Sequence, residues 1–283
     1  MSRPLFINNN GDIIPADSYA IRAGNRAFNY GDGLFESIRV INGKPIGMEH
    51  HYSRLKDGMK ALKMNHAAYM NQTWLADEVN KLIEKNKIDQ GGKVRLTVFR
   101  NQGGRFLPSD NDVSFLLEAE PLEQNFYVLN DEGLHVDIYP EMKKQLNQLS
   151  IYKTNNCLLY VMASLYAKEK GLDNVFITND KGGIIEATNA NIFIVSNGVL
   201  YTPSLEEGCL AGTMRMQIIN KAIDEGIKVY ECNLMPQNLL VADEIFLTNA
   251  LTGVNWVVSY RTKRYYNTMA KKIVNLLNAP HGG

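Results

Sequence analysis

The chain of 283 residues is long enough for two domains, and its 45% hydrophobic and 21% charged residues are typical of a soluble globular protein. Its 30 lysines and arginines balance its 30 aspartates and glutamates, so no basic field attracts nucleic acid or an anionic membrane. No apolar run approaches the roughly 20 residues of a membrane span, and the first residues lack a signal-peptide core, so we expect a cytoplasmic protein.

The first half of the chain alternates between strand and helix patterns. Asn42-Gly43 is a strong turn signal, and it predicts a hairpin, as does the stretch Asn9–Gly11. In chain order, the expected elements are hairpins over 5–15 and 34–46, helices over 48–62 and 74–87, and strands over 93–100 and 113–122. The composition changes over 121–130, which we take as a linker between an N-terminal domain, 1–120, and a C-terminal domain, 131–283.

The second half is richer in strands. In chain order, it predicts strands over 134–140, 174–178, 183–187 and 191–203, a helix over 213–225, strands over 227–234 and 244–251, and a last helix over 265–277. The predicted fold class is therefore mixed α and β, with two domains whose junction is a natural place for a ligand.

Cysteines and histidines give no sign of a metal site or a disulfide framework. The three cysteines are isolated and odd in number, and the five histidines lack ligand spacing. The motifs GxxxxGK[ST] and GxSxG do not occur, and no GxGxxG lies between a strand and a helix. We therefore expect no metal, and several common enzyme classes are excluded.

Lys153 is the one charged residue of the segment 145–167. Apolar residues at helical spacing follow it, and we expect Thr154 or Asn155 to cap their helix. A cation just before a helix start meets an unfavourable field, and partial burial would further favour a neutral amine that can act as a nucleophile or base. The alternative is an ordinary lysine whose stem lies on apolar neighbours.

Two earlier segments can be interpreted as structure or as parts of a site. The glycine-flanked aspartate of "YGDGLF" marks a turn between aromatic residues and a strand. Arg54, in "HHYSRL", is either a solvated arginine or the bidentate partner of a phosphate.

Two later segments suggest a buried acid and an anion site. Glu186 is the only acid of a strand-turn-strand unit over 183–195, and a buried carboxylate needs a cationic or protonated partner. The loop of "GCLAGTMR" opens a helix, and such loops present N–H groups to an anion. A lysine, a carboxylate, an arginine and an anion site are together what pyridoxal phosphate requires.

The order of the segments "YGDGLFESIRV", "HHYSRL", "YKTNN", "EATNANIF", "LAGTMR" and "EIFLTNAL" resembles the fold-type IV pyridoxal-phosphate enzymes, also called class IV aminotransferases. The resemblance runs from about residue 5 to residue 258. It implies a D-amino acid aminotransferase-like fold with a smaller N-terminal α/β domain and a C-terminal pseudo-barrel domain. It also implies a homodimer with the cofactor between the domains.

The resemblance assigns roles to particular residues. Lys153 stands where the family has its Schiff-base lysine, and Glu186 where it has the acid that faces the pyridine nitrogen. The remaining matches are the phosphate-binding Arg54, the amide pair Thr213 and Met214, the further phosphate contacts Asn249 and Ala250, and the active-site aromatic Tyr30.

The family contains branched-chain amino acid transaminases, D-amino acid transaminases and 4-amino-4-deoxychorismate lyases. Leu158 replaces a tyrosine of the branched-chain enzymes, and Leu107 replaces a histidine of the D-amino acid enzymes, whereas "GTMR" and "NAL" resemble the lyases. We therefore favour a lyase that releases pyruvate and 4-aminobenzoate, with branched-chain transamination as the alternative.

Two further functions stay open, namely D-amino acid transamination and a non-catalytic cofactor-binding dimer. The presence of both Lys153 and Glu186 argues against the second. For a substrate that carries an amino group and a carboxylate, Arg105 and also Arg100 are candidates to bind the carboxylate, with a surface arginine as the alternative interpretation of each.

Overall fold

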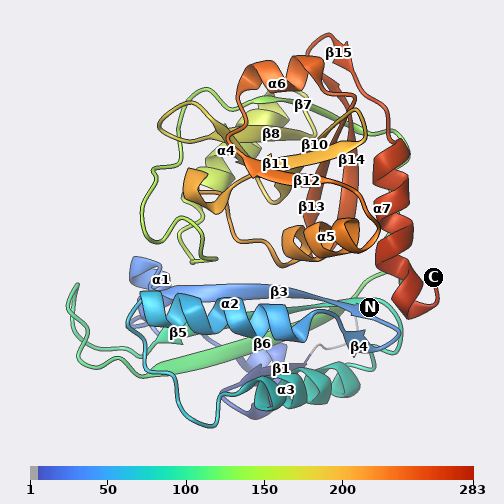
Figure 1. Ribbon diagram of the computed structural model, residues 1–283. Helices are drawn as coiled ribbons and strands as arrows, with labels where there is room; N and C mark the ends of the chain where they lie inside the picture. The colour runs from blue at the N-terminus through green and yellow to red at the C-terminus, as the bar shows by residue number, and fades with distance from the viewer. Residues whose placement is uncertain (1–5) are drawn as a thin grey trace. The chain divides into compact units, whose positions relative to one another are not determined.

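The computed structural model describes residues 6–283, so Leu5, the first residue of the first expected hairpin, lies outside the described residues. The chain divides into two compact units (Figure 1). The first unit holds the residues up to Phe126 together with Tyr152–Asn156, and the second holds Tyr127–Ile151 and Cys157–Gly283. The junction after Phe126 falls within 121–130, whereas the sequence pattern does not predict the return of Tyr152–Asn156 to the first unit.

The first unit is built on an antiparallel sheet of six strands in the order β2-β1-β6-β5-β3-β4. The strands are β1 (Phe6–Asn9), β2 (Asp12–Pro15), β3 (Gly33–Ile41), β4 (Lys44–Pro45), β5 (Gly92–Arg100) and β6 (Val113–Pro121). Both expected hairpins form, because Asn10-Gly11 and Asn42-Gly43 take the positive φ angles that two-residue hairpin turns require.

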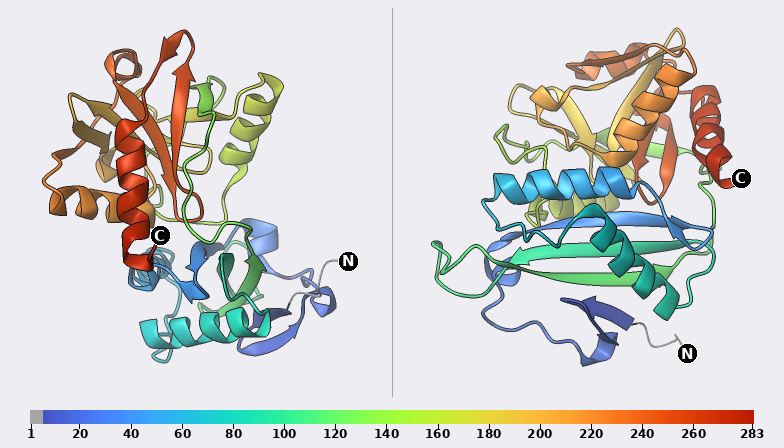
Figure 2. Two further views of the ribbon diagram at one scale, coloured as in Figure 1. Left: turned by 90° about the vertical axis from the view of Figure 1, so that its right-hand side faces the viewer. Right: turned by 60° about the horizontal axis from the view of Figure 1, so that its bottom comes forward.

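Two helices cover one face of this sheet and enclose the core of the first unit. Alternate residues of β3, β5 and β6 point to that face. The helices α2 (Met48–Ala61) and α3 (Gln72–Lys85) pack Leu55, Met59, Val79 and Leu82 against it. Figure 2 (right) shows α3 running across the strands. Two short elements, η1 (Ala16–Ser18) and α1 (Arg26–Tyr30), precede β3.

The second unit is built on a larger sheet in the order β12-β11-β10-β13-β14-β7-β8-β9, with β15 paired to β14. Its strands are β7 (Leu134–Ile138), β8 (Asn174–Thr178), β9 (Ile184–Ala187), β10 (Asn191–Ser196), β11 (Val199–Pro203), β12 (Val229–Cys232), β13 (Glu244–Asn249), β14 (Gly253–Tyr260) and β15 (Lys263–Arg264). The end strand β9 also lies beside β10. The sheet therefore curls into a half-barrel, as the expected pseudo-barrel requires.

Helices pack on the outside and the ends of this half-barrel. They are α4 (Leu158–Glu169), η2 (Leu205–Glu207), α5 (Thr213–Asp224), α6 (Pro236–Val241), α7 (Thr268–Asn278) and η3 (Ala279–His281). Helix α7 runs along β14 (Figure 2, left), α5 packs on β13, and α4 packs on β8. No helix in the part of the chain that the structure describes is long and apolar enough to cross a membrane.

The helix expected directly after Lys153 begins later than predicted. Helix α4 starts at Leu158 with Cys157 as its N-cap, so the prediction that Thr154 or Asn155 caps it is wrong. The reason is that residues 153–155 are extended and pair with β3. The sequence pattern also misses the strand β14 and the short helices α1 and α6.

Candidate active site

Lys153 lies in an extended segment that is held against the first residues of β3. The Phe35 N–H donates to the carbonyl of Lys153 at 2.9 Å, and the Asn155 N–H donates to the carbonyl of Gly33 at 2.9 Å. An antiparallel bridge joins Leu34 and Thr154 between these two bonds. The backbone of the lysine is therefore fixed by a strand that lies more than a hundred residues earlier in the chain.

The "YGDG" turn makes this close approach possible. Gly31 ends α1 at a φ of +64°, and a Cβ added there would lie 2.6 Å from the Asn156 side chain. A Cβ at Gly33 would lie 2.6 Å from the Asn155 side chain. Since real Cβ atoms do not tolerate such distances, both glycines are required for the "KTNN" segment to pair with β3.

The side chain of Lys153 lies over an aromatic ring that it shares with an arginine. Its Nζ is 4.2 Å from the centroid of the Phe35 ring, and the Cζ of Arg95 is 4.0 Å from the same centroid. Such distances are those of cation–π contacts. Arg95, which the sequence pattern does not single out, is the arginine whose guanidinium contacts the same aromatic ring as the lysine.

Arg54 is locked in a buried cluster rather than solvated. Its Nε donates to Glu36 Oε1 at 2.9 Å, and its Nη2 pairs with Glu36 Oε2. His51 Nδ1 lies 2.6 Å from the same Oε2. Glu36 and His51 are both about 1% exposed, so the carboxylate fixes the orientation of the guanidinium away from bulk water.

This cluster has perturbed acid–base properties. Burial alone would raise the pKa of Glu36, but the charge of Arg54 and the hydrogen bonds from His51 and Arg54 outweigh it and lower that pKa from 4.5 to about 2. Burial also lowers the pKa of His51 and outweighs the opposing effect of Glu36, so the imidazole is neutral near pH 7.

Both shifts make the fold sensitive to acid. A lowered folded-state pKa contributes stability that is present above the unfolded pKa and is lost as the pH falls. We expect the free energy of unfolding to decline below the ordinary His51 pKa of 6.5 and more steeply between 4.5 and about 2, where Glu36 accounts for about 3 kcal/mol. Urea unfolding across this pH range measures the effect, and an equally steep slope in Glu36→Gln would contradict it.

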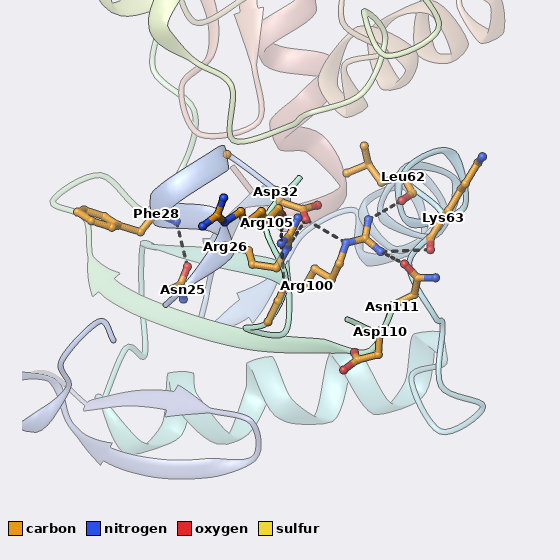
Figure 3. Close-up of polar contacts among 12 residues, drawn as sticks. Asn25, Arg26, Phe28, Asp32, Leu62, Lys63, Arg100, Arg105, Asp110 and Asn111 are labelled. Carbon is orange, nitrogen blue, oxygen red and sulfur yellow. Dashed lines mark hydrogen bonds and ion pairs between the residues drawn. The ribbon is translucent and has the colours of Figure 1, made fainter. Parts of the chain in front are cut away.

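Arg100 is occupied by structural contacts. Its Nε lies 3.0 Å from the Asp32 carboxylate, and its other nitrogens donate to the carbonyls of Leu62 at 2.7 Å and Lys63 at 3.3 Å. The Asn111 side chain accepts a further bond. Figure 3 shows the guanidinium surrounded by these groups. Arg100 therefore ties the "GDG" turn to the end of α2, which leaves little capacity for a substrate carboxylate.

Arg105 lies in an exposed loop that Arg26 holds. The Nη1 of Arg26 donates to the carbonyls of Gly103 at 3.0 Å and Arg105 at 2.6 Å, while the Arg105 side chain is exposed (Figure 3). The ring of Tyr30 is 40% exposed and lies 5.8 Å from that of Phe106, centroid to centroid. Tyr30 and this loop thus form one partly exposed aromatic edge in the first unit.

In the second unit, Glu186 is 2% exposed and accepts three hydrogen bonds. Lys144 Nζ and Tyr160 Oη each lie 2.7 Å from Oε1, and the Leu210 N–H donates to Oε2 at 2.7 Å. The prediction that a buried Glu186 needs a cationic or protonated partner is confirmed: Lys144 is the cation, and the Tyr160 hydroxyl donates its proton to the same oxygen. Neither Lys144 nor Tyr160 was nominated from the sequence.

The loop before α5 is held by β10. Asn191 Nδ2 donates to the carbonyl of Leu210 at 2.8 Å, and a Cβ on Gly212 would lie 1.9 Å from Asn191 Oδ1. Only glycine therefore fits at the N-cap of α5.

The start of α5 has the properties of an anion site. The first bond of the helix runs from the Met216 N–H to the carbonyl of Gly212 at 3.1 Å. The N–H groups of Thr213, Met214 and Arg215 precede it and have no acceptor within the helix, and the helix dipole favours an anion there.

Thr248, at the end of β13, adds a polar group to this region. It is paired with Asn191 across the sheet, so the two side chains share a face. Its Oγ1 is buried and has no hydrogen-bond partner within residues 6–283. Such an atom is costly unless a partner binds, and the sequence analysis missed it because a threonine in a strand is unremarkable.

Asn249 and Ala250 follow directly. The Asn249 side chain accepts the N–H groups of Leu251 at 3.0 Å and Thr252 at 2.9 Å, so it shapes the turn into β14. The Ala250 carbonyl accepts the Tyr127 hydroxyl at 3.2 Å.

The nominated residues divide between the two units. The first unit holds Tyr30, Arg54, Arg100, Arg105 and Lys153, and the second holds Glu186, Thr213, Met214, Asn249 and Ala250. Each unit presents a distinct chemistry: an amine with three arginines in the first, and a buried carboxylate with a helix-start anion site in the second.

Comparison with known proteins identifies the family to which the chain belongs. The model of the family "Amino-transferase class IV" matches residues 33–260. A protein of Methanocaldococcus jannaschii, provisionally named branched-chain-amino-acid aminotransferase, is 30% identical over 87% of this chain and 84% of its own length. The aminodeoxychorismate lyase of Bacillus subtilis is 25% identical over 87% of this chain and 83% of its own length.

Among solved structures, the fold is similar to that of a branched-chain aminotransferase from the archaeon Thermoproteus uzoniensis, solved with norvaline. The TM-score is 0.89 at 22% sequence identity, over 98% of this chain and 94% of that chain.

Proposed function

Since the chain belongs to the class IV aminotransferases and is therefore a pyridoxal-phosphate-dependent enzyme, we propose that it binds the cofactor covalently at Lys153 and transfers the amino group of an amino acid to a 2-oxo acid. The observation that carries the proposal is the pairing of a buried carboxylate, Glu186, with an anion site at the start of α5. The first suits a protonated ring nitrogen, and the second suits a phosphate.

The residues present fit this cofactor. The three N–H groups at the start of α5 supply donors for a phosphate. The orphaned hydroxyl of Thr248 adds a donor on the same face of the sheet as Asn191. Arg54, held rigid by Glu36, supplies a charge that a phosphate would bind.

When bound, pyridoxal phosphate supplies an aldehyde that captures amines and a ring that withdraws electrons. Lys153 would hold the aldehyde carbon at rest and, once displaced by the substrate, move the proton on the amine-bearing carbon. Glu186 would keep a proton on the ring nitrogen. The phosphate would bind Thr213, Met214, Asn249, Ala250 and Arg54.

We propose Arg95 as the first candidate for binding the substrate carboxylate. Its guanidinium lies over the same ring as the Lys153 amine, whereas the donors of Arg100 are engaged by Asp32 and by backbone carbonyls. Arg105, whose side chain is exposed, is the second candidate, and Tyr30 would contribute an aromatic contact to the substrate.

A second candidate function is 4-amino-4-deoxychorismate lysis. It is favoured by Leu158, which stands where the branched-chain enzymes have a tyrosine, and by the similarity to the lyase of Bacillus subtilis. The 30% identity to the Methanocaldococcus jannaschii protein, together with an arginine that contacts the same aromatic ring as Lys153, leads us to place transamination first.

The two functions are distinguished by their products. We expect the purified enzyme to form glutamate from leucine and 2-oxoglutarate; in this reaction the Lys153 amine would move the proton on the amine-bearing carbon, and the substrate carbon–oxygen bond that a lyase breaks would play no part. Coupled assays for glutamate, and for pyruvate from aminodeoxychorismate, measure both reactions. Arg95→Lys should raise the KM for the amino acid, while Lys93→Met, in the same strand, serves as a control. Pyruvate without glutamate would reverse the assignment in favour of the lyase.

We further propose that the enzyme is a homodimer and is cytoplasmic. Helix α4 exposes large apolar residues at helical spacing, namely Leu158, Val161, Met162 and Leu165, which are 69%, 50%, 38% and 49% exposed. A stripe of this kind on one helix is typical of a surface that another copy covers. None of the three cysteines forms a disulfide within residues 6–283, in keeping with a reducing compartment.

A further inference from the structure

The Glu186 carboxylate has an uneven distribution of partners. An ionised carboxylate offers about four lone-pair sites, two on each oxygen. Lys144 and Tyr160 together fill those of Oε1, whereas Oε2 accepts one bond, from the Leu210 N–H. Within the described residues, the acceptor site that the protein leaves open therefore lies on Oε2, beside the loop that leads into α5.

Backbone contacts of Lys144 hold it where its side chain reaches the Glu186 carboxylate. Its N–H donates to the carbonyl of Thr178 at 2.9 Å, and a parallel bridge pairs it with Asn179 at the end of β8. Its side chain is 12% exposed, against 3% for Glu186. The ion pair is thus largely withdrawn from water, so little solvent screens the attraction between its two charges.

Tyr160 completes the arrangement from the first turn of α4. Burial, together with the charge of Glu186, raises the pKa of Tyr160, so its hydroxyl keeps its proton and serves as a donor. The Tyr160 hydroxyl therefore remains a donor to Oε1 near neutral pH.

We propose that Lys144 is a positioning residue that balances the charge of Glu186 and, with Tyr160, saturates Oε1, so that the cofactor's ring nitrogen can be held only by Oε2. The inference rests on the proposed function, since it specifies which atom of Glu186 receives the ring proton. It gives a role to a lysine that does not itself touch the reacting atoms.

The other titratable groups near this pair are accounted for. The Cys209 thiol is buried, and burial raises its pKa to about 12, so it stays neutral. Cys157 lies at the start of α4, near Tyr160. A further cation of this region, Arg215, is paired with Glu231. Lys144 is therefore the group that balances the charge of Glu186 in the described part of the second unit.

Removal of the Lys144 ammonium should change the number of protons that are taken up when the cofactor binds. A buried carboxylate without a counter-ion favours its protonated form. In Lys144→Gln or Lys144→Met, Glu186 would then already carry a proton, which must leave when a protonated ring nitrogen binds. Cofactor binding should therefore take up about one proton fewer than in the wild type at slightly acid pH.

Calorimetry measures this directly. The full chain, freed of cofactor, is titrated with pyridoxal 5'-phosphate in two buffers of different ionisation enthalpy at the same pH, which gives the number of protons exchanged. We expect Lys144→Arg to match the wild type, and Lys144→Gln and Lys144→Met to differ from it by about one proton. Tyr160→Phe should weaken binding without changing the count. Lys143→Met, which changes the exposed neighbour, is the control.

The outcomes distinguish a failure of the proposed role of Lys144 from a failure of the proposed function. Equal proton counts in the wild type, Lys144→Gln and Lys144→Met would overturn the positioning role and reduce Lys144 to a packing residue. Should Lys144→Met fail to fold, Lys144→Gln, which keeps a donor, still decides the matter. Absence of heat and of yellow colour in the wild type itself would instead reject the proposed function.

Discussion

Lys153→Ala is expected to abolish turnover, with a loss of at least roughly 10³-fold, because it removes the amine that we propose holds the cofactor and acts as the general base, a role that alone contributes about 10²–10⁴. Steady-state rates measure the loss. Borohydride reduction of the wild type followed by peptide mass analysis should show the cofactor mass on the peptide that contains residue 153, and Lys153→Ala should carry none.

The structure provides a matched control for this change. Lys143→Ala removes an exposed lysine in the same stretch of chain and should retain both activity and label. The backbone bonds of residue 153 to β3 do not involve its side chain, so Lys153→Ala should keep its fold and should sediment at the same rate as the wild type. Label at another lysine, or turnover within tenfold of the wild type, would overturn the assignment.

Glu186→Gln is expected to slow turnover by about 10²–10³-fold, because a neutral amide holds the ring proton, and the charge that develops in the transition state, far less well. It should also destabilise the protein, since the substitution leaves Lys144 buried without a counter-ion, at a cost of about 3–5 kcal/mol. Rates and chemical unfolding measured on the same preparation separate the two effects.

A double substitution distinguishes the structural role of Glu186 from its chemical role. Glu186→Gln combined with Lys144→Met removes both charges, so we expect most of the lost stability to return while the rate stays low. Near-normal turnover in either variant would mean that another group serves the ring nitrogen.

Much of the fold follows from local patterns in the sequence. Both hairpins form where the Asn-Gly and Asn-Asn-Gly turns predict them, because these residues tolerate the positive φ angles of tight turns. The helices α2, α3 and α5 lie within a few residues of their expected ranges, since their apolar residues recur at helical spacing and cover a sheet.

The segment around Lys153 could not be predicted in this way. Thr154 and Asn155 are good caps, and apolar residues at helical spacing follow them, yet both lie in an extended pairing with β3. Long-range backbone bonds outweigh a local capping preference, and nothing within the segment indicates which distant strand it meets.

In the site, too, some features follow from the local sequence and others depend on contacts between distant residues. The need for a partner at Glu186 follows from one buried acid among apolar neighbours, but its identity depends on where residue 144 meets the end of β8. For the arginines of β5, the alternation of side chains along the strand could have shown which face each one points to. Arg100 shares the core-facing parity of Val94, Leu96 and Val98 in β5, whereas Arg95 points to the opposite face, with Phe35.

The return of Tyr152–Asn156 to the first unit makes both units discontinuous along the chain. The polypeptide passes between the two units three times, after residues 126, 151 and 156, so neither unit is a continuous stretch of chain. A fragment that ends at residue 126 would lack Tyr152–Asn156 and therefore part of the first unit. Lys153, the proposed Schiff-base residue, lies in the short returning segment Tyr152–Asn156, and the chain continues into the second unit on both sides of that segment.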